Sequence, residues 1–266
     1  MKTLLNIPFL FIILALGGVS AFSQVDGKTA SKALPFASGE KLTYEAKISR
    51  LKIGVAIADL SFAVDAVPNS QNYLIKTKAD SKGTLLKLFR FSFLQEFESL
   101  VDFSASRIIK TTKHDVQKER VRDSVADFDY SQKRVTYVEM DPKNTTRPPR
   151  RIASQIEDQT YDLASGIYAL RKVPLTVGKS FEITISDSGL VYTLPVRVTA
   201  REQQKSILGK QWCFRVEPVI FGNGRLIEQK GSLIIWFTDD DRRVPVRSQI
   251  NTTYGKIDIR LKSISN

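Results

Sequence analysis

Hydrophobic and polar residues alternate along most of this chain. The alternation is clearest over residues 42–49, 56–64, 192–198, 233–237 and 256–262. A period of two residues is typical of β-strands that bury one face and leave the other face in water. Antiparallel sheets tolerate one wet face, so the pattern favours antiparallel pairing over a parallel sheet.

Further strand and turn signals lie between these segments. Phe89, Phe91 and Phe93 form an aromatic stripe that predicts one face of another strand, and the segment 83–88 is compatible with a short helical turn. Residues that favour turns separate the predicted strands, as at 68–70, 141–144, 222–224 and 239–241.

One segment has the period of a helix. From about Asp158 to Lys172, apolar residues recur at Leu163, Ile167 and Leu170, which places them on one side of a helix. Asp158 or Asp162 can cap its start, Arg171 and Lys172 suit its end, and Pro174 forbids its continuation. Gly166 costs about 1 kcal/mol relative to alanine inside a helix, so packing must hold this segment.

These signals predict an all-β, mainly antiparallel fold with one short helix near 158–172. The predicted architecture is a large curved sheet, a half-barrel or a sandwich. We expect a single β domain over residues 35–266, preceded by a flexible segment at 24–34. A proline-rich polar loop at 141–151 could divide the domain into two halves, and the sequence does not choose between one curved sheet and two packed halves.

The N-terminus has the layout of a secretory signal peptide. Lys2 is followed by an apolar run from Leu4 to Val19, and Ala21 and Ser23 suit the positions before a cleavage site. This run is short of the roughly 20 residues that a membrane-spanning helix needs. We therefore predict a signal peptide at residues 1–23, export to the periplasm and no transmembrane segment in the mature chain. No cysteine lies near the cleavage site, so we do not expect a lipoprotein.

The chain is basic, with a formal net charge of +12 at pH 7. In an exported protein this charge suits anionic envelope components such as lipid headgroups or acidic glycans, and it equally suits a protein kept soluble by charge. Export and the absence of a recognisable nucleic-acid-binding motif argue against nucleic acid as a partner. The only cysteine, Cys213, lies between Trp212 and Phe214, which favours a buried, inert thiol.

Several landmarks resemble a known family. These are Gly39-Glu40 with Leu42, Tyr44 and Glu45; Asp162, Ser165, Tyr168 and Arg171 on the predicted helix; Gly178; Trp236 with Thr238-Asp239-Asp240, Arg243 and Pro245; and Gly255. In this order they resemble the bacterial exported family known as domain of unknown function 3108, over about residues 35–261. The resemblance implies an all-β envelope domain and brings no activity or catalytic residue.

Four of the landmarks are candidate ligand-binding residues, namely Tyr168, Arg171, Trp236 and Arg243. The landmarks on the helix are spaced by three residues, so they cannot all point the same way. The structural interpretation is favoured: Asp162 caps the helix, Tyr168 packs, and Arg171 forms a salt bridge or a C-terminal cap. Trp236 is likewise favoured as a core or cross-strand aromatic. The acidic turn at 239–241 lacks the further oxygen ligands of a calcium site, and the only histidine, His114, lies on a charged strand. We expect no catalytic residue, metal site or cofactor.

Three function hypotheses remain open. The first is a periplasmic, non-catalytic domain that binds or carries an apolar or anionic amphiphilic envelope component. The second is an interaction module for an envelope assembly machine, which would present an exposed apolar patch or a free sheet edge. The third is a hydrolase of lipid or glycan, whose paired carboxylates can lie far apart in the sequence.

Overall fold

The computed structural model describes residues 33–50, 53–253 and 255–266. The predicted signal peptide at 1–23, and most of the predicted flexible segment at 24–34, lie outside the described residues.

The described residues form fifteen strands and two short helices. In chain order these are β1 (Glu40–Arg50), β2 (Ile53–Ala66), β3 (Asn72–Ser81), α1 (Gly83–Phe89), β4 (Phe93–Asp102), β5 (Arg107–Gln117), β6 (Arg120–Asp129), β7 (Arg134–Met140), β8 (Arg150–Gln155), β9 (Thr160–Tyr161), α2 (Leu163–Lys172), β10 (Ser180–Asp187), β11 (Leu190–Ser206), β12 (Gly209–Pro218), β13 (Gly231–Thr238), β14 (Pro245–Thr252) and β15 (Gly255–Ser265).

All fifteen strands belong to one sheet, in the order β8-β7-β6-β5-β4-β3-β2-β1-β15-β14-β13-β12-β11-β10-β9. The first and last strands, β1 and β15, pair side by side in its centre, and β8 and β9 are its two edges. Every pairing is antiparallel except the short one between β9 and β10. The predicted all-β, mainly antiparallel fold with a large curved sheet is confirmed, and the segment 141–151 connects two neighbouring strands, β7 and β8.

The prediction of a strand through Phe89 and Phe91 is wrong. Phe89 ends α1, and β4 begins only at Phe93. Arg90 adopts a left-handed conformation with φ of 51°, and its N–H donates to the carbonyl of Leu86, which ends the helix. Phe91 and Phe93 still pack together, with ring centroids 6.2 Å apart. The alternation of aromatic residues therefore reflects packing rather than one continuous strand.

Helix α2 starts later than the predicted range of 158–172. Asp162 is its N-cap, and its carboxylate accepts a hydrogen bond from the backbone N–H of Ser165. Thr160 and Tyr161 are extended and pair with Thr184 and Ile185 at the edge of the sheet. Asp162 is therefore the N-cap, and the helix cannot begin earlier because Thr160 and Tyr161 are paired in the sheet.

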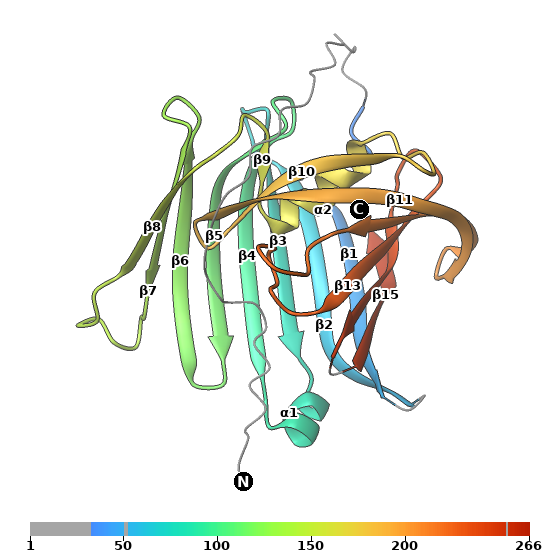
Figure 1. Ribbon diagram of the computed structural model, residues 1–266, viewed down its shortest axis with the longest axis horizontal. Coiled ribbons are helices and arrows are strands. Elements are labelled where there is room, and N and C mark those ends of the chain that lie inside the picture. Colours follow the sequence, from blue (N-terminus) through green and yellow to red (C-terminus); the bar gives the residue numbers. More distant parts are fainter. Residues whose placement is uncertain (1–32, 51–52, 254) are drawn as a thin grey trace.

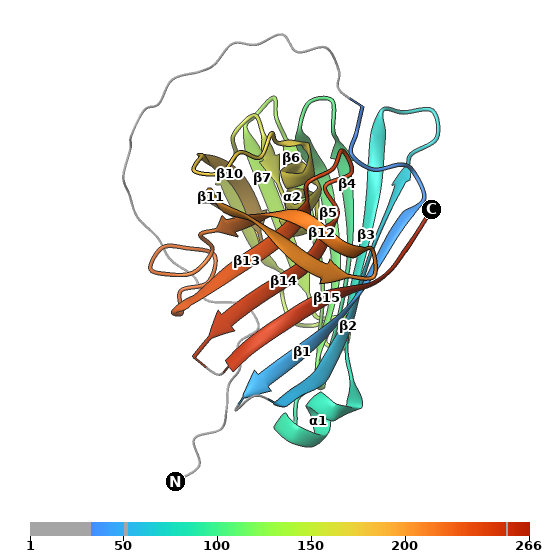
Figure 2. The same ribbon diagram turned by 90° about the vertical axis from the view of Figure 1, so that its right-hand side faces the viewer.

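The sheet curls so that its two halves face each other across α2 (Figure 1, Figure 2). Tyr168 and Ala164 pack with buried residues of β2 to β7, whereas Ala169 and Leu170 pack with buried residues of β10 to β13. Gly166 allows this close packing, because a β-carbon there would lie 2.7 Å from Cδ1 of Ile185. The helix thus fills one end of the curved sheet, and it is held there by packing, as predicted from Gly166.

Helix α1 lies at the other end of the curved sheet (Figure 1). Its Leu85 packs with Ala46, Ile57, Ala58 and Ile257 in a separate apolar cluster. Within the described part of the chain, no helix has the length and apolar character needed to cross a membrane.

Candidate functional site

The start of α2 is held by a buried polar cluster. One carboxylate oxygen of Asp162 accepts hydrogen bonds from the N–H and the hydroxyl of Ser165, both at 2.7 Å. The other accepts hydrogen bonds from the hydroxyls of Ser99 and Thr111, on β4 and β5. A single carboxylate therefore caps the helix and fixes it to the first half of the sheet.

The middle of α2 is held by aromatic packing. The Tyr168 ring makes an edge contact with Phe36, with centroids 4.9 Å apart, and Phe103 lies 6.4 Å away. The side chain is buried and its hydroxyl has no hydrogen-bond partner among the described residues. Burial raises the pKa of this hydroxyl, so it stays protonated at neutral pH. Tyr168 therefore lies in the core.

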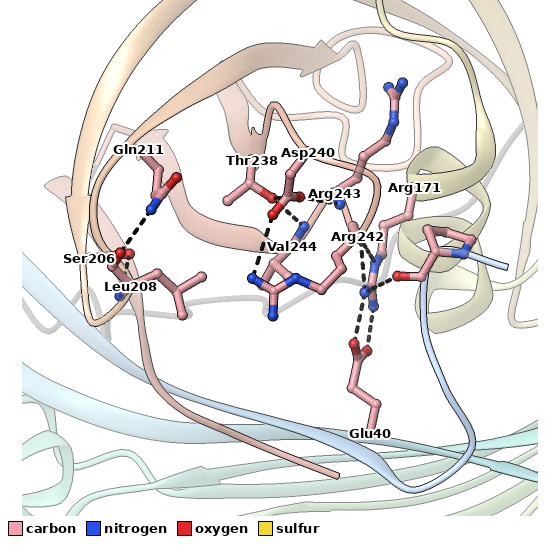
Figure 3. A network of polar contacts seen from close by, with 11 residues as sticks. Glu40, Arg171, Ser206, Leu208, Gln211, Thr238, Asp240, Arg242, Arg243 and Val244 are labelled. Atoms are coloured by element: carbon pink, nitrogen blue, oxygen red, sulfur yellow. Dashed lines mark hydrogen bonds and ion pairs between the residues drawn. The ribbon is translucent and has the colours of Figure 1, made fainter.

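The end of α2 is held by a buried ion pair (Figure 3). The Arg171 guanidinium donates to both carboxylate oxygens of Glu40, at 2.5 and 2.9 Å. It also donates to the backbone carbonyls of Pro35 and Arg242, and it stacks over the rings of Phe36 and Tyr168. The ion pair joins α2 to β1, and the bond to the Arg242 carbonyl joins α2 to the turn between β13 and β14.

That turn clamps the helix end a second time. Asp240 accepts hydrogen bonds from the N–H of Arg243 and from the hydroxyl of Thr238. The Arg243 guanidinium reaches back to the carbonyl of Val173, the C-cap residue of α2, at 3.0 Å. The acidic turn is thus a scaffold for Arg243. Among the described residues, no three His, Cys, Asp or Glu side chains are grouped so that they could hold a metal ion.

Trp236 belongs to a different part of the molecule. It alternates along β13 with Ile235 and Phe237, which pack in the same core as α2, so its ring points to the opposite face of the sheet. There its indole N–H donates to Glu202 at 2.5 Å, and the Arg247 guanidinium lies 4.7 Å above the ring. Of the four predicted ligand-binding residues, Tyr168, Arg171 and Arg243 gather around α2, and Trp236 does not join them.

A cleft of about 540 Å³ opens beside the end of α2, and none of those four residues lines it. Its walls come from four separate segments: the β4–β5 turn, the β8–β9 connection with β9, the last turn of α2, and β10. The lining residues are Ser106, Glu157, Asp158, Gln159, Tyr161, Ala169, Lys172, Val173, Pro174, Phe181, Glu182, Ile183 and Thr184.

The cleft has an apolar floor. Tyr161, Ala169 and Ile183 are buried, and Phe181 is half-buried. Burial also raises the pKa of the Tyr161 hydroxyl, which keeps this wall uncharged at neutral pH. Such a floor matches the apolar part of a small ligand.

The polar groups of the cleft are of two kinds. The Lys172 ammonium donates to the carbonyl of Phe103 and to the hydroxyl of Ser106, and burial lowers its pKa. Three exposed carboxylates, of Glu157, Asp158 and Glu182, form the rim. The lysine is therefore occupied by the protein's own groups, and the rim is acidic.

One strand edge also faces the cleft. The N–H of Val198 donates to the carbonyl of Lys179. The backbone N–H and C=O groups of odd-numbered β10 residues therefore bond to β11, and those of even-numbered residues point to the opposite edge of β10, where β9 lies. On that side β9 pairs only with Thr184 and Ile185. The backbone N–H and C=O of Glu182 are therefore directed towards the open edge that lines the cleft.

Other reactive side chains lie apart from the cleft. Cys213 is buried, and burial raises the pKa of its thiol to about 12, so the thiolate is scarce at neutral pH. His114 on β5 is hydrogen-bonded through Nδ1 to Asp123 of β6, at 2.6 Å. Neither residue lines the cleft.

Comparisons with known proteins give a family and a fold. The family model described as "Protein of unknown function (DUF3108)" matches residues 43–262. No curated protein matches the chain. Among solved structures, a beta-barrel-like protein of DUF1849 from Brucella abortus is similar, with a TM-score of 0.60 and 9% sequence identity, over 86% of this chain and 97% of that one. At this identity the likeness concerns the fold alone.

Proposed function

Because the chain belongs to the DUF3108 family of proteins of unknown function, we propose its function from the cleft beside α2: the protein is a non-catalytic domain of the bacterial cell envelope that binds an amphiphilic ligand. The observation that carries this proposal is the cleft itself, with about 540 Å³ of space over an apolar floor. Clefts of roughly 300–1,000 Å³ that combine an apolar surface with placed polar groups are typical of small-molecule sites. This cleft has that size, and seven of its thirteen lining residues are polar or charged.

The polar groups indicate which ligand the cleft favours. A ligand with an apolar segment would cover Tyr161, Phe181 and Ile183, and an amide or hydroxyl on it could pair with the backbone groups of Glu182. The acidic rim favours a neutral or cationic polar end. The sequence had suggested an anionic end, from the net charge of the whole chain. The proposal follows the local charge, because exposed charges farther away than about 10 Å are largely screened.

The landmarks that resemble the family support a binding domain rather than an enzyme. Their charged groups are already bonded within the protein. Glu40 pairs with Arg171, whereas Asp162 and Arg243 bond to backbone groups of α2 and its C-cap. Envelope location rests on the signal-peptide pattern of residues 1–23.

Native mass spectrometry tests the proposal. We expect protein purified from the envelope to carry an extra mass that organic extraction removes. Phe181→Ala removes part of the cleft floor and should weaken ligand retention by about tenfold, since burying an aromatic side chain is worth roughly 1.5–3 kcal/mol. Val177→Ala is the matched control, because Val177 is an exposed apolar residue outside the cleft.

Two results would contradict the proposal. A protein that carries no extra mass in any preparation has no resident ligand. Equal retention by the two variants places the ligand somewhere other than the cleft.

A further inference from the structure

The end of the β11–β12 hairpin leaves the main sheet. β11 and β12 stay paired as far as Ser206 and Gly209, but β12 pairs with β13 only from Cys213 to Val216. Residues 200–212, called here the distal hairpin, therefore extend beyond the last pairing with β13. Figure 1 shows β11 curving away at the side of the molecule.

The two faces of the distal hairpin differ. On one face Glu202 accepts a hydrogen bond from the Trp236 indole, and Gln204 accepts one from Arg247, so this face is fixed against β13 and β14. The other face is exposed and carries Arg201, Gln203, Lys205, Lys210 and Trp212. One face of the distal hairpin is therefore attached to β13 and β14, and the opposite face, called here the free side, is exposed to solvent.

The turn of the distal hairpin is held in a defined shape (Figure 3). The side-chain amide of Gln211 donates to the carbonyl of Leu208 at 2.9 Å, and the N–H of Leu208 donates to the hydroxyl of Ser206 at 3.1 Å. Leu208 packs against the apolar cluster that contains Trp236. Ile207, its neighbour in the turn, is left 49% exposed.

The free side combines apolar and cationic groups. Trp212 is 46% exposed, five positions after Ile207. Arg201 stacks over the Trp212 ring at 4.5 Å and pairs with Asp239. Lys205 and Lys210 lie opposite each other across the hairpin, and neither has an ion pair with another described residue.

We propose that the distal hairpin docks the protein on an anionic phospholipid surface. Tryptophan favours the boundary between headgroups and acyl chains, and an exposed isoleucine at a turn can enter the apolar layer. Two unpaired lysines beside them would meet phosphate groups, an arrangement that recurs in proteins that lie on membrane surfaces. Single exposed apolar residues are common, as at Leu86 and Val177, but here one in the turn and one on the adjoining strand belong to the same hairpin, together with two lysines.

Tryptophan fluorescence reports directly on this contact. The chain has two tryptophans, and Trp236→Phe leaves Trp212 as the single reporter. Addition of vesicles of phosphatidylcholine and phosphatidylglycerol should shift Trp212 emission to shorter wavelength and protect it from acrylamide. Phosphatidylcholine vesicles should not. An emission spectrum unchanged by the anionic vesicles, in a variant whose circular dichroism is native, overturns the proposal.

Co-sedimentation with the same vesicles gives a second measurement that keeps both tryptophans. Ile207→Ser with Lys210→Glu should lower binding at least tenfold, since each cation near an anionic surface contributes about fivefold and its reversal more. Leu86→Ser with Lys87→Glu is the matched control: it changes an exposed apolar residue and a lysine on α1 and gives the same net charge.

All variants are the mature protein without the predicted signal peptide at residues 1–23, so that its apolar run contributes to none of them. The control should bind as the unchanged protein does. Equal loss in both double variants would mean that only net charge matters, and it overturns the proposal. Because Phe181→Ala should leave vesicle binding unchanged, failure of the membrane contact and failure of the cleft proposal can be told apart.

Discussion

Arg171 and Arg201 each hold a guanidinium nitrogen 2.5 Å from a carboxylate oxygen, yet their surroundings are opposite. The side chains of Arg171 and Glu40 are 0% and 4% exposed, whereas those of Arg201 and Asp239 are 43% and 28% exposed. Solvent screens the exposed pair, so it contributes little to the free energy of unfolding. The buried pair has lost its water and depends on every remaining partner, so a residue's role here follows from burial rather than from charge.

Arg171→Met should therefore lower the free energy of unfolding by about 3–5 kcal/mol, because it leaves the Glu40 carboxylate buried and unpaired. Arg201→Met, with the same atom-to-atom distance, should cost no more than about 1 kcal/mol. Urea unfolding of both variants measures the difference. Adding Glu40→Leu to Arg171→Met removes the unpaired charge, so the double variant should be no less stable than Arg171→Met. Equal costs for the two single variants would refute the role of burial.

The residues of the buried network could be named from the sequence, but their partners could not. Glu40 and Arg171 are 131 positions apart, and the Arg242 carbonyl that also accepts from Arg171 lies 71 positions further along the chain. The cleft was missed for the same reason. Tyr161, Lys172 and Phe181 show no shared motif, and only the folding of four segments brings them together.

At the scale of elements, local sequence signals predicted that a helix or strand exists better than they predicted where it begins and ends. The apolar stripe at Leu163, Ile167 and Leu170 indicated a helix, and α2 is there. Its start could not be chosen, because Asp158 and Asp162 are equally good caps in isolation. Tertiary contacts decide: Asp162 also reaches Ser99 and Thr111 on two strands, which no local pattern encodes.

This difference between the two aspartates is measurable. Asp162→Ala removes the cap and leaves the hydroxyls of Ser99 and Thr111 without their acceptor, so it should cost about 2–4 kcal/mol of unfolding free energy. Asp158→Ala removes an exposed carboxylate whose contact with Lys133 is 3.7 Å long, and it should cost about 0.5 kcal/mol or less. Thermal unfolding followed by circular dichroism compares them. A large loss from Asp158→Ala would show that the helix is capped there.

At the scale of the whole molecule, the alternation of apolar residues predicted a curved antiparallel sheet but not its strand order. Pairing of β1 with β15 joins residues more than 200 positions apart, and the register follows from which faces must be buried. The curvature brings distant strands together as well. The turn between β10 and β11 lies against β7 and β8, at the other end of the strand order.

Gly189 lies in that turn and is packed against β7 and β8. Its φ is +81°, and a β-carbon on it would lie 2.6 Å from Cβ of Tyr137 and 3.0 Å from Cβ of Ile152. Both of those atoms are fixed to strand backbones, so they cannot move aside as the end of a flexible side chain could. The absence of a side chain at Gly189 therefore allows the β10–β11 turn to lie this close to β7 and β8.

Gly209 provides the matched comparison, because its φ is +82° and no atom lies within 4 Å of the position of its β-carbon. Gly209→Ala should cost only the left-handed backbone strain, about 1–2 kcal/mol. Gly189→Ala carries the same strain plus the collision with β7 and β8, so it should cost at least about 3 kcal/mol, measured by urea unfolding. Hydrogen exchange should rise in β7 and β8 only for Gly189→Ala. If the two alanine variants were equally stable, contact between the turn and these strands would contribute nothing to holding the curved sheet closed.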